Sequence, residues 1–243
     1  MKTGIQVSSF RPVLMNEEQV AYAFEQMQAM GCEYVQLQWI DRAVSIDHIA
    51  RCLTKTGIQN VSVQDFYEVI RQDPGYYIEL NRATGGKWMC VSRIPERLKS
   101  RAGLAEFVNE LRAFQKELDA WSQKLCFHPV SADFAPIEGI DPVQWLLEAM
   151  PELAIASDLY HLNRCRDMIP WLKNYPGRVC MVHFKDENQQ GDLVPPGQGI
   201  VPWAGVADTC REIGVEYAFA EQERWEGDPF QRLKEGFDWV KRQ

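Results

Sequence analysis

The feature that most constrains this 243-residue chain is a rhythm of short apolar runs, each followed by a longer amphipathic stretch. Apolar residues recur at helical spacing in the longer stretches, whereas the short runs are rich in β-branched and aromatic residues, as strands are. Strands that alternate with helices are parallel, because each helix returns the chain to the end where the previous strand began. The strand-like runs cover residues 4–8, 34–38, 58–63, 88–92, 125–128, 153–157, 179–184 and 215–220.

Eight strand–helix units predict an α/β protein, a (β/α)8 TIM barrel formed by residues 1–243 as a single domain. No linker or low-complexity tract divides the chain. A doubly wound open sheet is the alternative, but Ser8-Ser9-Phe10-Arg11 stands where that fold usually carries its glycine-rich phosphate loop. Helices are predicted over residues 16–31, with Asn16 as N-cap and Gly31 as C-terminal stop, and over 46–55, 65–81, 102–121, 142–150, 164–174, 203–213 and 229–241.

Composition excludes some classes of partner. The formal net charge is −8 and lysine and arginine form no basic stripe, which disfavours nucleic acid. No apolar run approaches the roughly 20 residues of a membrane span. The first residues lack the apolar region of a secretory signal, and the seven cysteines are odd in number without a C-x-x-C pair. We therefore expect a cytoplasmic protein with reduced thiols and no membrane partner.

Polar residues follow three of the last predicted strands. Asp158 ends one strand, His183 and Lys185 end the next, and Glu221 and Glu223 end the last. The open face of a barrel is formed where its strands end, so these side chains are expected to meet. Two carboxylates and an imidazole suit one divalent ion, Mn²⁺, Mg²⁺, Co²⁺ or Zn²⁺. A hydrogen-bonded core histidine is the structural alternative, and the spacing alone leaves both open.

Several motifs resemble a known family. VHFKD (182–186), PPGQGIVPW (195–203) and FAEQE (219–223) resemble the last third of the sugar phosphate isomerase/epimerase family, whose members are xylose isomerase-like TIM barrels. SDLYHLNRCRD (157–167) resembles the preceding strand, and LCFHPVSADF (125–134) resembles the fifth strand. In the first half of the chain only the strand–helix rhythm matches.

The resemblance implies a ligand set for a single divalent metal ion. Asp158, His183 and Glu221 match the family's ligands, and Asp133 stands where the pattern has its glutamate. The fifth-strand segment departs from the pattern, because a proline and a valine replace an Asn-His pair and Asp133 is one methylene shorter. Residues expected to contact substrate are His128, His161, Glu223 and Trp203.

The implied activity is isomerisation or epimerisation of a small sugar or keto-sugar. The metal would hold a carbonyl and its neighbouring hydroxyl, which acidifies the adjacent C–H bond and stabilises an enediolate. Glu221, with Asp133 opposite, is expected to move the proton, and Lys185 to assist the charged oxygen. His161 is alternatively a surface residue, Trp203 alternatively anchors the next helix, and Lys185 alternatively pairs with Asp186 or Glu223.

Three other functions compete. A keto-polyol (inosose-type) dehydratase begins with the same proton removal, and a non-catalytic sugar-binding barrel is compatible with the altered fifth strand. A phosphodiesterase like the apurinic endonucleases is disfavoured, because four histidines are too few for a trinuclear zinc site. No arginine cluster is evident in the sequence, so a phosphorylated substrate is not implied. The oligomeric state stays open, with a homo-oligomer as one option.

Overall fold

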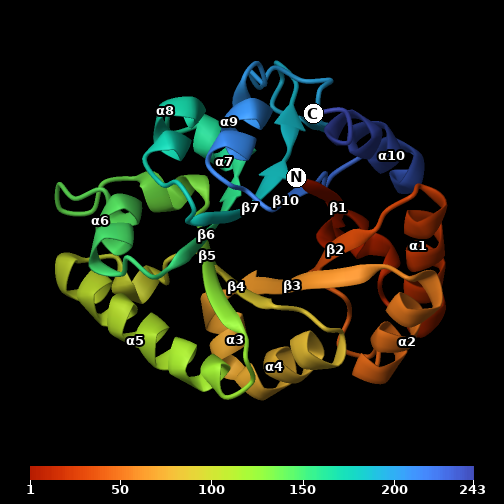
Figure 1. Cartoon of the computed structure of the whole chain (residues 1–243), viewed down its shortest axis with the longest axis horizontal. Coiled ribbons are helices and arrows are strands. Elements are labelled where there is room, and N and C mark those ends of the chain that lie inside the picture. Colours follow the sequence, from red (N-terminus) through yellow and green to blue (C-terminus); the bar gives the residue numbers. More distant parts are fainter.

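The computed structural model describes all 243 residues, and eight parallel strands close into a barrel at its centre (Figure 1). The strands pair in chain order, and β1 closes the ring against β10. The predicted (β/α)8 barrel is therefore confirmed. The barrel strands are β1 (Lys2–Gln6), β2 (Tyr34–Leu37), β3 (Gln59–Phe66), β4 (Trp88–Ser92), β5 (Lys124–His128), β6 (Ala154–Asp158), β7 (Val179–Phe184) and β10 (Tyr217–Ala220), and a separate antiparallel pair consists of β8 (Asp186–Glu187) and β9 (Leu193–Val194).

Helices surround the barrel on its outside (Figure 1). The α-helices are α1 (Glu17–Ala29), α2 (Ile46–Thr56), α3 (Tyr67–Gln72), α4 (Pro74–Ala83), α5 (Arg101–Asp119), α6 (Pro142–Ala149), α7 (Leu159–Asn163), α8 (Met168–Lys173), α9 (Val206–Glu212) and α10 (Pro229–Val240). Three 3₁₀ helices, η1 (Val7–Val13), η2 (Glu96–Leu98) and η3 (Ser131–Phe134), lie in loops that follow strands. None of the helices combines the length and the apolar character that a membrane crossing requires.

Local signals explain where most helices begin and end. Asn16 caps α1 as predicted, its side chain accepting a hydrogen bond from the Gln19 amide at 3.0 Å. Two predicted helices differ from the structure. The helix expected over 65–81 breaks at Asp73, which caps α4 ahead of Pro74, because a proline restricts the residue before it. The helix expected over 164–174 is shortened to α8, which starts at Met168, and a separate short helix, α7, precedes it from Leu159 with Asp158 as its N-cap.

The apolar core has two parts. A cluster of 60 buried residues fills the space between the strands and the surrounding helices. A second cluster fills the barrel itself, with one side chain from each of six strands, namely Val61, Cys90, Cys126, Ala156, Met181 and Phe219. Strand alternation then places His183 above Met181 and Glu221 above Phe219. The polar residues therefore stand on an apolar plug, at the end of the barrel where the strands finish.

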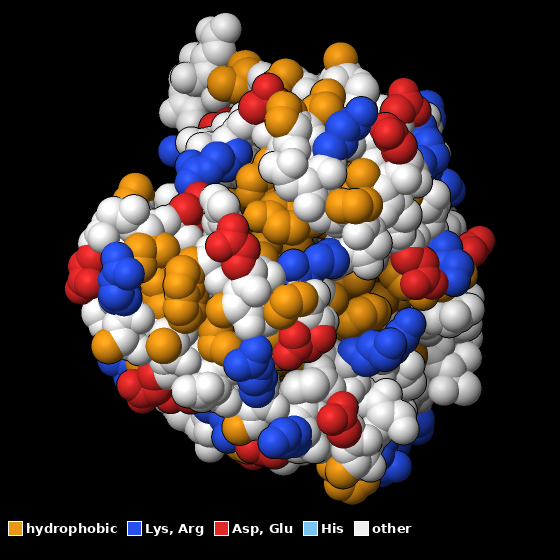
Figure 2. Space-filling view, turned by 60° about the vertical axis from the view of Figure 1, so that its left-hand side comes forward, with side chains coloured by type: hydrophobic (Ala, Val, Ile, Leu, Met, Phe, Trp, Pro, Cys, Tyr) orange, Lys and Arg blue, Asp and Glu red, His pale blue; other side chains and the backbone are white.

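The molecular surface carries charges of both signs. Acidic and basic side chains are interspersed over the face shown in Figure 2, and neither sign forms a continuous stripe there. All seven cysteines are free.

Candidate metal centre

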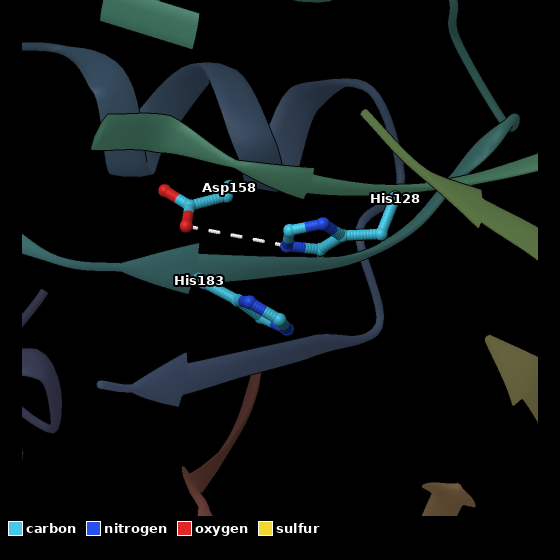
Figure 3. A group of neighbouring side chains, drawn as sticks. All are labelled: His128, Asp158 and His183. Atoms are coloured by element: carbon cyan, nitrogen blue, oxygen red, sulfur yellow. Dashed lines mark ion pairs between the residues drawn. The ribbon is translucent and has the colours of Figure 1, made fainter. Parts of the chain in front are cut away.

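Four adjacent strands supply the side chains at the floor of the open face. His128 ends β5, Asp158 ends β6, His183 lies in β7 opposite Asp158, and Glu221 follows β10. Figure 3 shows His128, Asp158 and His183 pointing into one shared space from neighbouring strands. One ligand atom from each of these three residues lies within 4.8 Å of the others. All four side chains are buried.

The atoms that face this space lack hydrogen-bond partners. They are His128 Nε2, His183 Nδ1 and Glu221 Oε2, all buried. His183 Nδ1 lies 2.9 Å from Glu221 Oε2, but the contact is not aligned as a hydrogen bond. Asp158 Oδ1 accepts the amides of Tyr160 and His161, which leaves Oδ2 directed at His128 Nε2, 4.0 Å away. Buried polar atoms without partners are costly.

A single cation held by His128, Asp158 and His183 would partner these atoms, and Glu221 Oε2 lies beside His183. Two imidazole nitrogens and two carboxylate oxygens suit Zn²⁺, Mn²⁺ or Co²⁺. Ligand atoms that share one such ion at about 2.0–2.2 Å lie roughly 3.0–3.5 Å apart. The distance of 2.9 Å between His183 Nδ1 and Glu221 Oε2 is slightly shorter than that spacing. The distance of 4.0 Å between His128 Nε2 and Asp158 Oδ2 is longer. The residues present therefore fit a divalent ion.

Neighbouring side chains orient both imidazoles. His183 Nε2 lies 2.6 Å from Gln36 Oε1, an acceptor, so Nε2 carries the proton and the Nδ1 lone pair faces the site. Gln6 Nε2 also donates to Gln36 Oε1, at 3.0 Å. His128 Nδ1 lies 3.3 Å from Ser92 Oγ, which leaves Nε2 for the site. Such outer contacts commonly orient the ligands of metal centres.

The protonation states also suit a cation. Burial, aided by the nearby His183, lowers the pKa of His128 to about 3, so that its imidazole is neutral. Burial opposes ionisation of Glu221, but the Lys185 ammonium outweighs it and lowers the pKa of the carboxyl group. Burial likewise opposes the charge on Lys185, yet Glu221, Asp158 and Glu223 raise the pKa of its ammonium. Neutral imidazoles and ionised carboxylates are the forms that bind metals.

Lys185 connects two glutamates at the edge of the floor. Its Nζ lies 3.1 Å from Glu221 Oε1 and 2.5 Å from Glu223 Oε2. Of the two alternative pairings that the sequence left open, the structure shows the one with Glu223. Burial and the nearby Glu221 carboxylate raise the pKa of Glu223.

Asp186 anchors the loop that contains the motif of residues 195–203. Its buried carboxylate accepts amide hydrogen bonds from Gly197, Gly199 and Val201. Gly199 is required here, because a Cβ at this position would overlap the Asp186 carboxylate.

Trp203 belongs to the same loop anchor. It donates its Nε1 hydrogen to Asp186 at 2.9 Å, and its ring packs against Phe184 and Trp239. It does not line the pocket over the floor. Of the two roles that the sequence left open for Trp203, the structure shows the anchoring one.

Asp133 lies apart from the floor. Its Oδ1 accepts the Ile94 amide at 3.0 Å and its Oδ2 accepts the Val130 amide at 2.9 Å, so both oxygens are engaged with the backbone. The reason is local, since the chain turns into η3 at Ser131 and directs Asp133 back toward the loop after β4. The structure therefore brings His128 to the floor, where the resemblance had implied Asp133 as fourth ligand.

A pocket of about 420 Å³ opens over the floor. His161 and Glu223 line it, as expected for substrate contacts, together with Lys185. His161 Nδ1 lies 2.8 Å from Ser131 Oγ, and its Nε2 lies 3.7 Å from Asp158 Oδ2. Residues that the sequence reasoning missed also line this pocket, namely Ser8, Arg11, Gln38, Gln64, Arg93 and Arg224.

Comparison with solved structures identifies the fold. A sugar phosphate isomerase/epimerase from Parabacteroides distasonis superposes with a TM-score of 0.81 at 15% sequence identity, over 100% of this chain and 99% of that one. The chain folds as a xylose isomerase-like TIM barrel. The expected resemblance is confirmed at the level of the fold.

Two further structures share this fold. The E. coli 3-keto-D-glucoside 4-epimerase gives a TM-score of 0.72 at 16% identity, over 100% of both chains. The IOLI protein with a bound zinc atom gives 0.77 at 16% identity, over 100% of this chain and 96% of that one. No protein-family model and no curated protein matches the sequence. Relatives with this fold thus include isomerases and epimerases, at low sequence identity.

Proposed function

We propose that this protein is a divalent-metal-dependent isomerase or epimerase of a small sugar or keto-sugar, acting through an enediolate. The observation that carries the proposal is the group of buried atoms without partners at the ends of β5, β7 and β10, beside the buried Asp158 carboxylate at the end of β6. His128, Asp158, His183 and Glu221 would hold the ion. When bound, the metal supplies Lewis acidity, which polarises the substrate carbonyl and acidifies the neighbouring C–H bond.

The chain's own residues support proton transfer beside this floor. Glu221 Oε1 contacts Lys185 and Glu221 Oε2 faces the floor as a candidate metal ligand, while both oxygens of Asp133 accept backbone amides, so neither residue keeps an oxygen for the proton that the sequence assigned to it. Glu223 lines the pocket and uses one oxygen on Lys185, which leaves Oε1 free. We assign removal and return of the substrate proton to Glu223 Oε1. Lys185, fixed between two carboxylates, contributes positive charge where the enediolate oxygen develops.

The test is solvent-deuterium incorporation into small ketoses, followed by NMR in the presence of Mn²⁺, Co²⁺ or Zn²⁺ added in separate samples. We expect metal-dependent deuterium incorporation at the carbon next to the carbonyl, with formation of an isomer or epimer. Loss of water from the same substrate would identify the product of a dehydratase instead. Absence of exchange from every ketose with every metal would contradict the proposal and favour a non-catalytic sugar-binding barrel.

Variants separate the two glutamates. Glu223→Gln is expected to lower the exchange rate by a factor of about 10²–10⁴, the usual contribution of a general base, while metal content is kept. Glu221→Gln is expected to lose exchange together with metal. Metal content of both variants, measured by inductively coupled plasma mass spectrometry, distinguishes these outcomes. Unchanged exchange in Glu223→Gln would remove it as the proton carrier.

A further inference from the structure

Three arginines surround the pocket above the floor. Arg11 lies in η1, Arg93 follows β4, and Arg224 follows β10, so the three come from distant parts of the chain. None of the three guanidinium groups has a carboxylate partner or a side-chain hydrogen bond. The nearby Glu223 is already paired with Lys185. Guanidinium groups that face a pocket without a partner are suited to an anionic ligand.

Aromatic rings hold two of these arginines in place. The Arg11 guanidinium lies 4.7 Å from the centre of the Trp39 ring, and that of Arg93 lies 4.2 Å from the centre of the Phe66 ring. The two rings contact each other edge to face, 6.0 Å apart. Arg11, Trp39, Phe66 and Arg93 therefore form one wall of the pocket. Stacking uses the face of a guanidinium and leaves its N–H edge free for a carboxylate or phosphate.

The backbone of this wall is strained at two positions. Trp39 has φ of 57° and Arg93 has φ of 66°, values that residues other than glycine rarely adopt. Such strain persists where the surrounding structure enforces it, and it clusters at ligand sites. Trp39 Nε1 donates to Asp65 Oδ1 at 3.3 Å, which helps to hold the ring in the wall.

Ser8 provides an independent sign of a ligand in this pocket. Its side chain is fully buried and lines the pocket, yet its Oγ has no hydrogen-bond partner. Ser8 and Arg11 are three residues apart on the 3₁₀ helix η1, and side chains at that spacing lie on the same side. One ligand can therefore contact both.

From this arrangement we infer that the substrate is a hydroxyketone that also carries an anionic group, a carboxylate or a phosphate, bound by Arg11, Arg93 and Arg224. The inference rests on the proposed function, because the floor would hold the hydroxyketone end. The carboxylates lie at the floor, and the guanidinium groups of Arg11, Arg93 and Arg224, which we call the arginine rim, line the pocket above it. A substrate that has its hydroxyketone at one end and its negative charge at the other complements both. A neutral sugar would leave these guanidinium groups without an anionic partner.

The test compares three probes of the same length, D-fructose, D-fructuronate and D-fructose 6-phosphate, which differ only at the sixth carbon. Binding to the metal-loaded protein is measured by isothermal titration calorimetry. We expect at least one of the two anionic probes to bind about tenfold or more tightly than fructose, the usual scale of one charge-assisted hydrogen bond. Whichever anionic probe binds more tightly identifies the anion.

Variants test which arginines cause the tighter binding of the anionic probe relative to fructose. Arg11→Gln and Arg93→Gln are each expected to reduce the advantage of the anionic probe about tenfold, and Arg11→Lys less, because lysine keeps the charge but lacks the planar fork. Arg51→Gln on α2 is the matched control, since Arg51 is exposed and outside this pocket, and it should leave the advantage unchanged. The inference is overturned if fructose binds as tightly as both anionic probes, or if the double variant Arg11→Gln/Arg93→Gln keeps the advantage.

Metal content of the same preparations separates this inference from the proposed function. If the protein binds metal but binds neither anionic probe more tightly than fructose, the inference is overturned and the proposed function stays in place. A protein that takes up no divalent ion under any condition, yet binds an anionic probe more tightly than fructose, would contradict the proposed function and support the inference.

Discussion

At the scale of single residues, the orientation of His183 on β7 depends on the side-chain amide of Gln36 on β2, a strand that is not adjacent to β7 in the barrel. Gln36 Oε1 receives the Nε2 proton of His183 and is itself held by Gln6. Gln36 Nε2 donates to Ser62 Oγ, which prevents the amide from turning over. The free Nδ1 of His183 is thus a consequence of three buried side chains on β1, β2 and β3.

We predict that Gln36→Leu weakens metal binding about 10- to 100-fold, because the His183 ring loses the acceptor that sets its tautomer. Gln36→Glu is the matched control, since its carboxylate can accept the same proton, and it should retain most of the affinity. Competition with a chelator of known affinity measures both. Equal affinities for Gln36→Leu and the unaltered protein would contradict this role.

The residue scale also shows where sequence reasoning fell short. His183 and Asp158 could be predicted, because each ends a strand whose alternation is readable. His128 ends β5 in the same way, but the family pattern drew attention to Asp133, whose side chain a short 3₁₀ turn directs to backbone amides. A turn of this kind depends on local backbone geometry, which periodicity does not reveal.

At the scale of elements, Asp186 joins the end of β7 to the loop before α9. The carboxylate accepts five hydrogen bonds, from the amides of Glu187, Gly197, Gly199 and Val201 and from the Trp203 indole. The loop follows directly after Lys185, so this anchor also supports the strand end that carries the site.

We predict that Asp186→Asn lowers the free energy of unfolding by about 2–4 kcal/mol, because the new amide group faces backbone N–H donors that then lack an acceptor. Asp192→Asn on the exposed side of the same loop should change it by less than about 0.5 kcal/mol. Urea denaturation followed by circular dichroism measures both. A loss below about 1 kcal/mol in Asp186→Asn would show that the anchor is dispensable.

At the scale of the whole molecule, the barrel collects groups that are far apart in the sequence. The strand rhythm predicted this architecture, since eight parallel strands have few other ways to bury both faces. The arginine rim was not predictable in the same way. Arg11, Arg93 and Arg224 come to line one pocket only when the ring closes, and a net charge of −8 gives no hint of three arginines around that pocket.

Metal binding should stabilise the whole fold, because the ion binds the native barrel and not the unfolded chain. At a free metal concentration of about 100 times the dissociation constant, the gain is about 2.7 kcal/mol. For a chain of this length that raises the Tm by roughly 5–10 °C. Differential scanning fluorimetry with Mn²⁺, Co²⁺ or Zn²⁺ measures the shift, and His183→Ala should abolish it. An equal shift in His183→Ala would mean that the ion binds elsewhere.

The most direct test of the proposed metal ligands is the metal content per chain of the unaltered protein, His128→Ala and Asp133→Asn. It is measured by inductively coupled plasma mass spectrometry on correctly folded samples. We predict about one divalent ion in the unaltered protein, its loss in His128→Ala and its retention in Asp133→Asn, because His128 presents an unpartnered atom to the floor, whereas both oxygens of Asp133 accept backbone amides. Metal retained in His128→Ala but lost in Asp133→Asn, or no metal in the unaltered protein after incubation with the ion, would contradict this prediction.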